Sequence, residues 1–286
     1  MVRRTLVLML LLYGLACATP AQSRYLGFDR NYYPGDDALA ALRKTFDYTS
    51  YWLNAPPEAK ANTWTGKRAL LKQYGFGFLV LFNGRLEDKL GPDAKAAGAM
   101  GRADGKAAVA AAAREGFAPG VLIFLDQEEG GRMTGPQLAY VFGWIEAVRA
   151  AGDRAGVYCS AVTVRDESGL ISTARHIADE EAARTEKELG HKTATRLALW
   201  IADDQCPPSP GCTVEKPKAF PEFSRDPNVW VPVWQYAQSP RRQQFSAGCP
   251  KNTTPDGMCN APGLTPGPNS FVDLNLAESA DPSETP

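Results

Sequence analysis

Four acidic side chains lie at or near the ends of segments that the sequence predicts as strands. They are Asp29, Asp126, Glu128 and Asp273. Alternate residues of a strand point to the same side and lie about 6.6 Å apart along it, so Asp126 and Glu128 can reach one substrate. In a closed parallel barrel, the carboxyl ends of the strands share one mouth. We therefore expect all four carboxylates to face a common cleft.

Such a cleft would carry enough negative charge to change the protonation of its members. Ionised neighbours around Glu128 favour the protonated form of its side chain and raise its pKa. A protonated acid beside ionised carboxylates is what protonation of a glycosidic oxygen requires, and the ionised groups stabilise positive charge on the sugar. The residues therefore indicate glycoside hydrolysis. The same oxygens could instead hold calcium or magnesium, as in a calcium-dependent adhesion or structural module.

Catalysis by an activated serine or cysteine fits the sequence less well. Both histidines, His176 and His191, lie within or near the charged segment 171–190, which is predicted as a helix. A Ser–His or Cys–His pair would therefore have no base at the mouth. We expect both histidines on the surface, and neither a cofactor nor a bound metal.

Aromatic side chains gather near the same strand ends. Five candidates for substrate binding are Tyr158, Trp200, Trp234, Gln235 and Tyr236. Flat rings pack against sugar faces, and Trp234 and Tyr236 flank Gln235 at the end of a strand. The alternative is that these rings fill the core, where aromatic residues are common.

Eight apolar segments are predicted as the strands that position these residues. They are 25–29, 47–53, 76–82, 120–126, 155–160, 195–202, 229–236 and 271–276. Helical segments separate most of the first six strands, which is the βα repeat of a parallel barrel. The last connections are rich in Pro, Gly and Cys. The sequence therefore predicts a single TIM-like (β/α) barrel whose last three strands are joined by loops instead of helices.

Composition indicates a soluble globular protein. The 286 residues are 44% hydrophobic and 22% charged, and one barrel of this size commonly forms a single domain. Lys and Arg number 31 against 32 Asp and Glu, so no basic excess exists to neutralise phosphates. We expect no nucleic-acid partner, and a monomer.

The N-terminal segment predicts export. Arg3 and Arg4 precede the apolar run 5–16, and small residues follow it. The run is shorter than the roughly 20 residues of a membrane span, so residues 1–21 are interpreted as a cleaved signal peptide of a secreted or periplasmic protein. A retained membrane anchor and a lipid anchor through Cys17 are the alternatives.

The remaining chain divides into a barrel domain and a short tail. The barrel is assigned to residues 22–277. The tail, 278–286, has nothing apolar to bury and is expected to be disordered.

The cysteines of an exported chain are expected to pair locally. Cys206 and Cys212 enclose one Pro-containing and Gly-containing loop, and Cys249 and Cys259 enclose another. We expect two disulfides, Cys206–Cys212 and Cys249–Cys259. Zinc binding is the alternative, although it would favour CxxC spacings and a nearby histidine. Cys159 lies in an apolar run and is expected to be a buried, inert side chain.

Six short motifs occur in order between residues 25 and 276. They are GFD, IFLDQE, GVYCS, LALWIA, VWQY and VDLN. In this pattern the chain resembles the family-25 glycoside hydrolases, which are secreted N-acetylmuramidases or lysozymes, and the related bacterial glycoside-hydrolase-like barrel domains of unknown function. The resemblance implies a barrel whose last three strands lack intervening helices.

The resemblance also implies roles for the four acids. Glu128 would be the general acid and base, Asp126 would orient the substrate N-acetyl group as an internal nucleophile, and Asp29 and Asp273 would support the cleft. Retention without a glycosyl-enzyme would follow. One departure from the muramidases brings the chain closer to the glycoside-hydrolase-like relatives: the second strand reads DYTSYWLNAPP without a Lys-containing motif that ends in Glu-Gly. The chain also differs from those relatives, which often carry Asp-x-Asp where it has Asp126-Gln127-Glu128.

These observations lead to one main hypothesis and one rival. The main hypothesis is a secreted glycoside hydrolase that cleaves a cell-wall glycan, with peptidoglycan as the substrate. The rival is a carbohydrate-binding barrel at the cell envelope that does not turn over its ligand.

Overall fold

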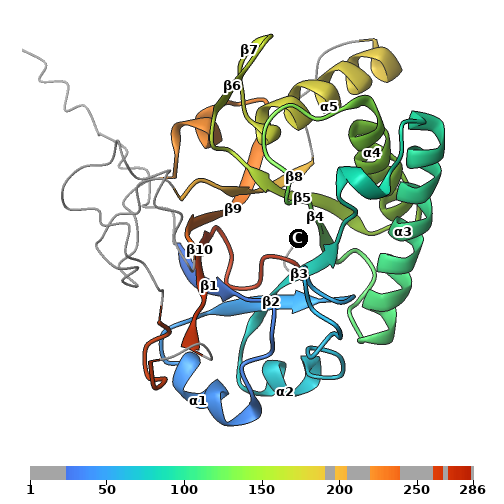
Figure 1. Cartoon of the computed structure of the whole chain (residues 1–286). Helices are drawn as coiled ribbons and strands as arrows, with labels where there is room; N and C mark the ends of the chain where they lie inside the picture. The colour runs from blue at the N-terminus through green and yellow to red at the C-terminus, as the bar shows by residue number, and fades with distance from the viewer. Residues whose placement is uncertain (1–23, 191–196, 205–219, 239–259, 267–269, 285–286) are drawn as a thin grey trace, which may run out of the picture.

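Eight strands close into one barrel around apolar and aromatic side chains (Figure 1). The computed structural model describes residues 24–190, 197–204, 220–238, 260–266 and 270–284. Around the barrel the strands follow the order β1-β10-β9-β8-β5-β4-β3-β2. Their bounds are β1 (Tyr25–Asp29), β2 (Tyr48–Trp52), β3 (Gly77–Asn83), β4 (Leu122–Asp126), β5 (Arg154–Ser160), β8 (Ala198–Ala202), β9 (Trp230–Ala237) and β10 (Asp273–Ala277). The predicted barrel is confirmed.

Seven of these strands run parallel, and β10 runs antiparallel to both of its neighbours. Asp29 of β1 lies opposite Asp273 of β10, and Trp234 of β9 lies opposite Leu276. A strand that enters at the end where its predecessor left runs antiparallel to it, because no crossover carries the chain back. The expectation of a parallel barrel throughout is therefore wrong for β10.

Helices alternate with strands only in the first two thirds of the chain. The α-helices are α1 (Leu39–Leu42), α2 (Arg68–Gln73), α3 (Ala94–Arg114), α4 (Gly135–Ala150) and α5 (Thr173–Leu189), and the 3₁₀ helices are η1 (Asp36–Ala38), η2 (Glu87–Lys89) and η4 (Glu222–Arg225). Between β8 and β10, the described residues contain only η4 as a helical element. This arrangement agrees with the prediction that loops join the last three strands.

Two helices, α3 and α4, pack closely against each other along the outside of the barrel (Figure 1). A side chain at Gly101 of α3 would place its Cβ 2.0 Å from the carbonyl oxygen of Tyr140 in α4, so only glycine permits this approach. The α4 helix begins with a capping box, in which Thr134 and Gln137 each bond the other's backbone N–H. These contacts fix the loop between β4 and α4, which carries Glu128.

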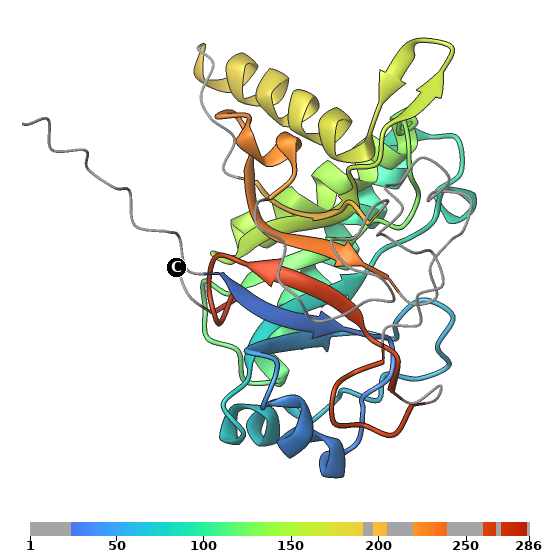
Figure 2. The ribbon, with the colours of Figure 1, turned by 90° about the vertical axis from the view of Figure 1, so that its left-hand side faces the viewer.

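A hairpin that the sequence analysis did not predict stands beside the barrel mouth. Its strands β6 (Val164–Asp166) and β7 (Gly169–Ile171) follow β5 and pair only with each other. In Figure 2 the mouth faces right, and the hairpin projects at the upper right. Arg132, in the β4–α4 loop, holds it through an ion pair with Asp166 (2.7 Å).

The C-terminal segment closes the opposite end of the barrel. The Ser283 N–H donates to the carbonyl of Phe78 in β3 (3.0 Å), and its carbonyl accepts from the Leu122 N–H at the start of β4 (2.8 Å). The same carbonyl accepts from Arg154 (2.9 Å), and the Ser283 hydroxyl accepts from the Val80 N–H (2.9 Å). Ser283 therefore bridges β3 and β4 at this end of the barrel.

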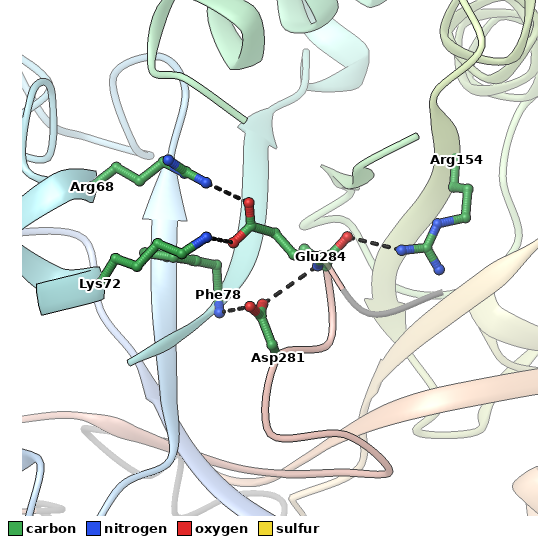
Figure 3. A network of polar contacts seen from close by, with 7 residues as sticks. Arg68, Lys72, Phe78, Arg154, Asp281 and Glu284 are labelled. Atoms are coloured by element: carbon green, nitrogen blue, oxygen red, sulfur yellow. Dashed lines mark hydrogen bonds and ion pairs between the residues drawn. The ribbon is translucent and has the colours of Figure 1, made fainter. Parts of the chain in front are cut away.

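Ion pairs and close packing secure this segment further. Glu284 pairs with Arg68 and with Lys72 of α2 (Figure 3). Gly77 leaves room for the chain, because a Cβ there would lie 2.0 Å from the carbonyl oxygen of Ala280. The expectation of a disordered tail is wrong for residues 278–284, because their order comes from backbone hydrogen bonds and ion pairs rather than from apolar burial.

Several predictions fall on residues that the structure does not describe. They concern the signal peptide, Cys17, His191 and the four paired cysteines Cys206, Cys212, Cys249 and Cys259. Cys159 is fully buried, as expected, and burial raises the pKa of its thiol. Within the described ranges, no helix combines the length and apolar character that a membrane crossing needs.

Candidate active site

Strand ends bring the predicted acids to one mouth. Asp29 ends β1 directly opposite Asp273, and Asp126 ends β4. Asp29 and Asp126 are 8% and 3% exposed, whereas Glu128 is exposed to solvent. The antiparallel direction of β10 places Asp273 at this mouth, because Asp273 is the first residue of its strand.

The charges of the four acids converge on one phenol, that of Tyr158 in β5. Its pKa is held well above its usual value, chiefly by burial. The next causes, in decreasing order, are the negative charges of Glu128, Asp29, Asp126 and Asp273. The four carboxylates therefore surround one site, as the spacing of acids along the sequence predicts.

The pKa values of the two buried acids at the mouth, Asp29 and Asp126, are raised. Burial raises the pKa of Asp29 to about 6, although hydrogen bonds from Asn275 and Gln235 partly offset the effect. Burial also raises the pKa of Asp126 well above its usual value, with repulsion from Glu128 and Asp29 as the further causes. Its Oδ2 atom is buried without a hydrogen-bond partner among the described residues. The site thus combines two buried acids whose pKa values are raised with an exposed carboxyl at its rim.

The loop that carries Glu128 is anchored on both sides of that residue. The Gln127 N–H donates to the Tyr158 carbonyl (3.0 Å). The Glu129 carboxylate accepts from the Glu87 N–H (2.9 Å) and from the side chain of Gln137 (2.7 Å). Glu129 is therefore engaged in holding the loop, and Glu128 is the member of this acidic pair that faces solvent.

An amide network that the sequence analysis missed holds Asp29. Its Oδ1 atom accepts from Nδ2 of Asn275 (2.6 Å) and from Nε2 of Gln235 (3.0 Å). The indole N–H of Trp200 donates to Asn275 (2.9 Å), and the Tyr158 hydroxyl donates to Gln235 (2.8 Å). Asn275 lies two residues after Asp273, so the period of a strand could have indicated that both share one face.

The aromatic candidates differ in how far they reach solvent. Trp200 and Tyr236 are each 1% exposed. The ring of Trp200 is packed against Tyr158 (4.8 Å between centroids) and Phe124 (5.8 Å), so it offers no open face to a sugar. Trp200 and Tyr236 therefore fill the core, which was the alternative prediction for these rings. Trp234 is half-buried, and its indole N–H donates to the Asp203 carbonyl (2.9 Å).

Gln235 is also committed to the protein. It is 1% exposed, and its amide oxygen accepts from Gln238 (2.6 Å) as well as from Tyr158. Its amide nitrogen donates to Asp29. All of these hydrogen bonds are to protein groups. This differs from the expectation that Gln235 contacts the substrate directly.

A pocket of about 250 Å³ opens where β1 and β10 meet at the mouth. Asp29, Asp273, Arg30 and Tyr32 contribute to its wall. Burial lowers the pKa of the Arg30 guanidinium, and the charge of Asp273 partly offsets this. Tyr32 is half-exposed (50%), so its ring can contact a ligand in the pocket. The sequence analysis selected neither Arg30 nor Tyr32.

The carboxylates do not assemble a metal centre. Among the described residues, no three His, Cys, Asp or Glu side chains form a group that could hold a metal ion. The alternative of calcium or magnesium at the four acids therefore gains no support from their geometry. His176 accepts a hydrogen bond from the Met133 N–H (3.0 Å) and so supports the β4–α4 loop.

Comparison with protein-family models assigns the chain. Residues 49–217, more than half of its 286 residues, match the family described as Rv2525c-like, glycoside hydrolase-like domain. The chain belongs to this family. The resemblance drawn from the six motifs is thereby confirmed, and the hydrolase class expected from the acids agrees with the family. A comparison with curated proteins finds no match.

Comparison with solved structures finds several similar chains. An uncharacterized protein of B. stearothermophilus is 20% identical with a TM-score of 0.58, over 88% of this chain and 95% of the other, which shows a common fold. The Tat-secreted protein Rv2525c of Mycobacterium tuberculosis is 11% identical (TM-score 0.47, covering 89% and 94%). A family 25 glycosyl hydrolase from Bacillus anthracis is 12% identical (TM-score 0.45, covering 88% of each chain).

Proposed function

We propose that this protein is a secreted glycoside hydrolase that cleaves a cell-wall glycan, with peptidoglycan as its substrate. The observation that carries the proposal is the meeting of two buried acids, Asp29 and Asp126, with the exposed Glu128 at one barrel mouth. Membership of a glycoside hydrolase-like family supports the same reaction class.

In the proposed reaction, Glu128 donates a proton to the glycosidic oxygen and later accepts one from water. Asp126 receives the N–H of the substrate acetamide on its unpartnered Oδ2, which favours ionisation of this carboxyl and aims the acetamide oxygen at the sugar carbon. Asp29 and Asp273 stabilise the positive charge on the sugar. The product keeps its configuration without a glycosyl-enzyme.

Space beside the mouth suits a polymer. A groove of about 650 Å³ includes Ala161 and Asp203, which directly follow β5 and β8, and Leu170 of the β6–β7 hairpin. Leu170 is 61% exposed, so the hairpin offers an apolar lip to a ligand that extends past the mouth. A long glycan could therefore occupy the mouth and the groove together.

The test is incubation of the mature protein with purified peptidoglycan, with release of reducing ends followed over time. We expect cleavage by the wild type and a fall of about 10² to 10⁴ in rate for Glu128→Gln, because general acid catalysis contributes this much. Glu167→Gln, the same change at another exposed glutamate, should cleave normally. Undiminished cleavage by Glu128→Gln would remove Glu128 from the mechanism.

One observation favours a second function, that of a carbohydrate-binding barrel without turnover. The pKa of Asp126 is raised well above its usual value by burial, which favours the protonated form of this acid in the free protein, whereas assistance to an acetamide uses its ionised form. Sedimentation of the protein with insoluble peptidoglycan, run beside the cleavage assay, separates the two functions. Binding without release of reducing ends by the wild type would establish the second one.

A further inference from the structure

Asp29 is held from one side only. Both of its hydrogen bonds from described side chains reach the same oxygen, Oδ1, and both donors are amide N–H groups, from Asn275 of β10 and Gln235 of β9. Asn275 is fully buried and Gln235 is 1% exposed, so water does not compete for these contacts. An oxygen that accepts two N–H donors has no room for a proton of its own.

Each amide is fixed in orientation by a group on its far side. The indole N–H of Trp200 can only donate, so the Asn275 oxygen must face Trp200 and its NH₂ must face Asp29. For Gln235, the oxygen accepts from the Tyr158 hydroxyl and from the Gln238 amide, which leaves its NH₂ for Asp29. Neither amide can turn its oxygen to the carboxylate without breaking these bonds.

We propose that Trp200 and Tyr158, acting through Asn275 and Gln235, keep Oδ1 of Asp29 as an acceptor and so assign the acid proton of Asp29 to Oδ2. This inference rests on the proposed function for its significance in catalysis. It makes Trp200, Asn275 and Gln235 positioning residues for the acid, in place of contacts to a sugar.

The sign of the effect follows from the chemistry of the contacts. Amide N–H donors stabilise the ionised carboxylate and therefore lower the pKa of Asp29 against the rise that burial causes. An amide oxygen turned toward Oδ1 would repel the ionised form and raise the pKa. Loss of the group that orients an amide should therefore raise it as well.

The sharpest variant is Trp200→Phe, which removes the indole N–H and keeps an aromatic ring in the barrel. Trp144→Phe is the matched control, because Trp144 is also fully buried but its indole N–H has no hydrogen-bond partner among the described residues. The readout is the titration of the Asp29 carboxyl, followed by carbon NMR in the full-length mature protein. The midpoint should rise by roughly one pH unit in Trp200→Phe and stay in place in Trp144→Phe.

Other titrating and charged groups surround Asp29, and both variants leave them unchanged. They are Arg30, which directly follows β1, Tyr48 on β2, Asp126 and Glu128 at and after the end of β4, Tyr158 on β5, Tyr236 on β9 and Asp273 on β10. A midpoint that differs between the variants therefore reports the orientation of Asn275.

A second variant, Asn275→Leu, removes one donor outright and should raise the midpoint in the same direction. Coincident midpoints for wild type, Trp200→Phe and Trp144→Phe would overturn the inference. Equal rises in both tryptophan variants would also overturn it, because ring loss alone would then be the cause. The titration needs no turnover, so a wild type that cleaves no glycan would end the proposed function and leave this result standing.

Discussion

At the scale of single residues, burial raises the pKa values of two of the acids at the mouth. Asp29 and Asp126 end strands β1 and β4 with almost no exposed surface, and desolvation is the largest cause of their raised pKa values. Glu128 lies two residues after Asp126 in a solvent-exposed position. The two kinds of environment divide the acids into a buried floor and an accessible rim, which is the arrangement that divides acid and base roles in other enzymes.

Asp29→Asn should change the pH dependence of stability. The pKa of Asp29 is about 6 in the folded protein against 3.8 in the unfolded chain, so the folded state binds this proton more tightly. The contribution of Asp29 to the stability of the wild type is therefore fully present below pH 4 and is lost as the pH rises through 6. Asparagine has no charge to bury and keeps an oxygen for Asn275 and Gln235.

The variant should consequently become more stable than the wild type as the pH rises. The difference in free energy of unfolding should be small at pH 4 and reach about 3 kcal/mol by pH 8. Urea denaturation of both proteins at several pH values measures it. A difference that does not change with pH would show that the carboxyl of Asp29 titrates alike in the folded and unfolded protein.

At the scale of elements, the C-terminal segment works as part of the barrel. Ser283 bonds β3 on one side and β4 on the other, and Glu284 joins the segment to Arg68 and Lys72. The side chains of Arg68 and Glu284 are 14% and 15% exposed, which makes this pair better shielded from water than a typical surface ion pair.

Deletion of residues 281–286 should destabilise the protein by roughly 3 kcal/mol or more, because at least four hydrogen bonds, each worth about 1 kcal/mol, are lost. Glu284→Gln, which removes only the ion pairs, should cost less. Thermal unfolding measures both. Because the segment lies opposite the mouth, glycan cleavage by the folded fraction should be kept. An unchanged melting temperature after deletion would mean that the segment contributes nothing to closure of the barrel.

At the scale of the whole molecule, the barrel has its candidate catalytic residues at one end and the C-terminal segment that closes it at the other. The β6–β7 hairpin and the loop that carries Glu128 stand at the mouth, while the C-terminal residues cover the far end (Figure 2). Changes at one end should therefore leave the other intact. The described mouth also carries Arg30, a cation among acids, so its charge is mixed rather than uniformly negative.

The proposed export of the protein leads to a prediction on its cysteines. Cys206 should pair with Cys212 and Cys249 with Cys259, because each pair closes a short loop and an exported protein meets oxidising conditions. Cys159 should stay reduced, because it is fully buried. Peptide mapping under non-reducing conditions tests the pairing. Four free thiols, or a bridge from Cys206 to Cys249 or Cys259, would contradict it.

The sequence by itself determined the barrel and placed acids at the ends of two of its strands. Strand β1 was predicted with its observed bounds, because a short apolar run between polar segments has few other ways to be buried. Asp29 and Asp126, which end β1 and β4, were found because parallel strands must present their carboxyl ends together. The composition of the last connections likewise indicated loops, because Pro and Gly interrupt helices.

Only the tertiary structure decided the contacts that depend on direction and on distant partners. The antiparallel course of β10 brings Asp273 opposite Asp29, and a parallel β10 would have carried it to the far end. The partners of Asp29 come from β9 and β10, more than 200 residues away. Ser283 is ordered by backbone groups of β3 and β4, which every sequence possesses. Apolar periodicity reports what an element buries, whereas polar networks and strand direction are set by which elements meet.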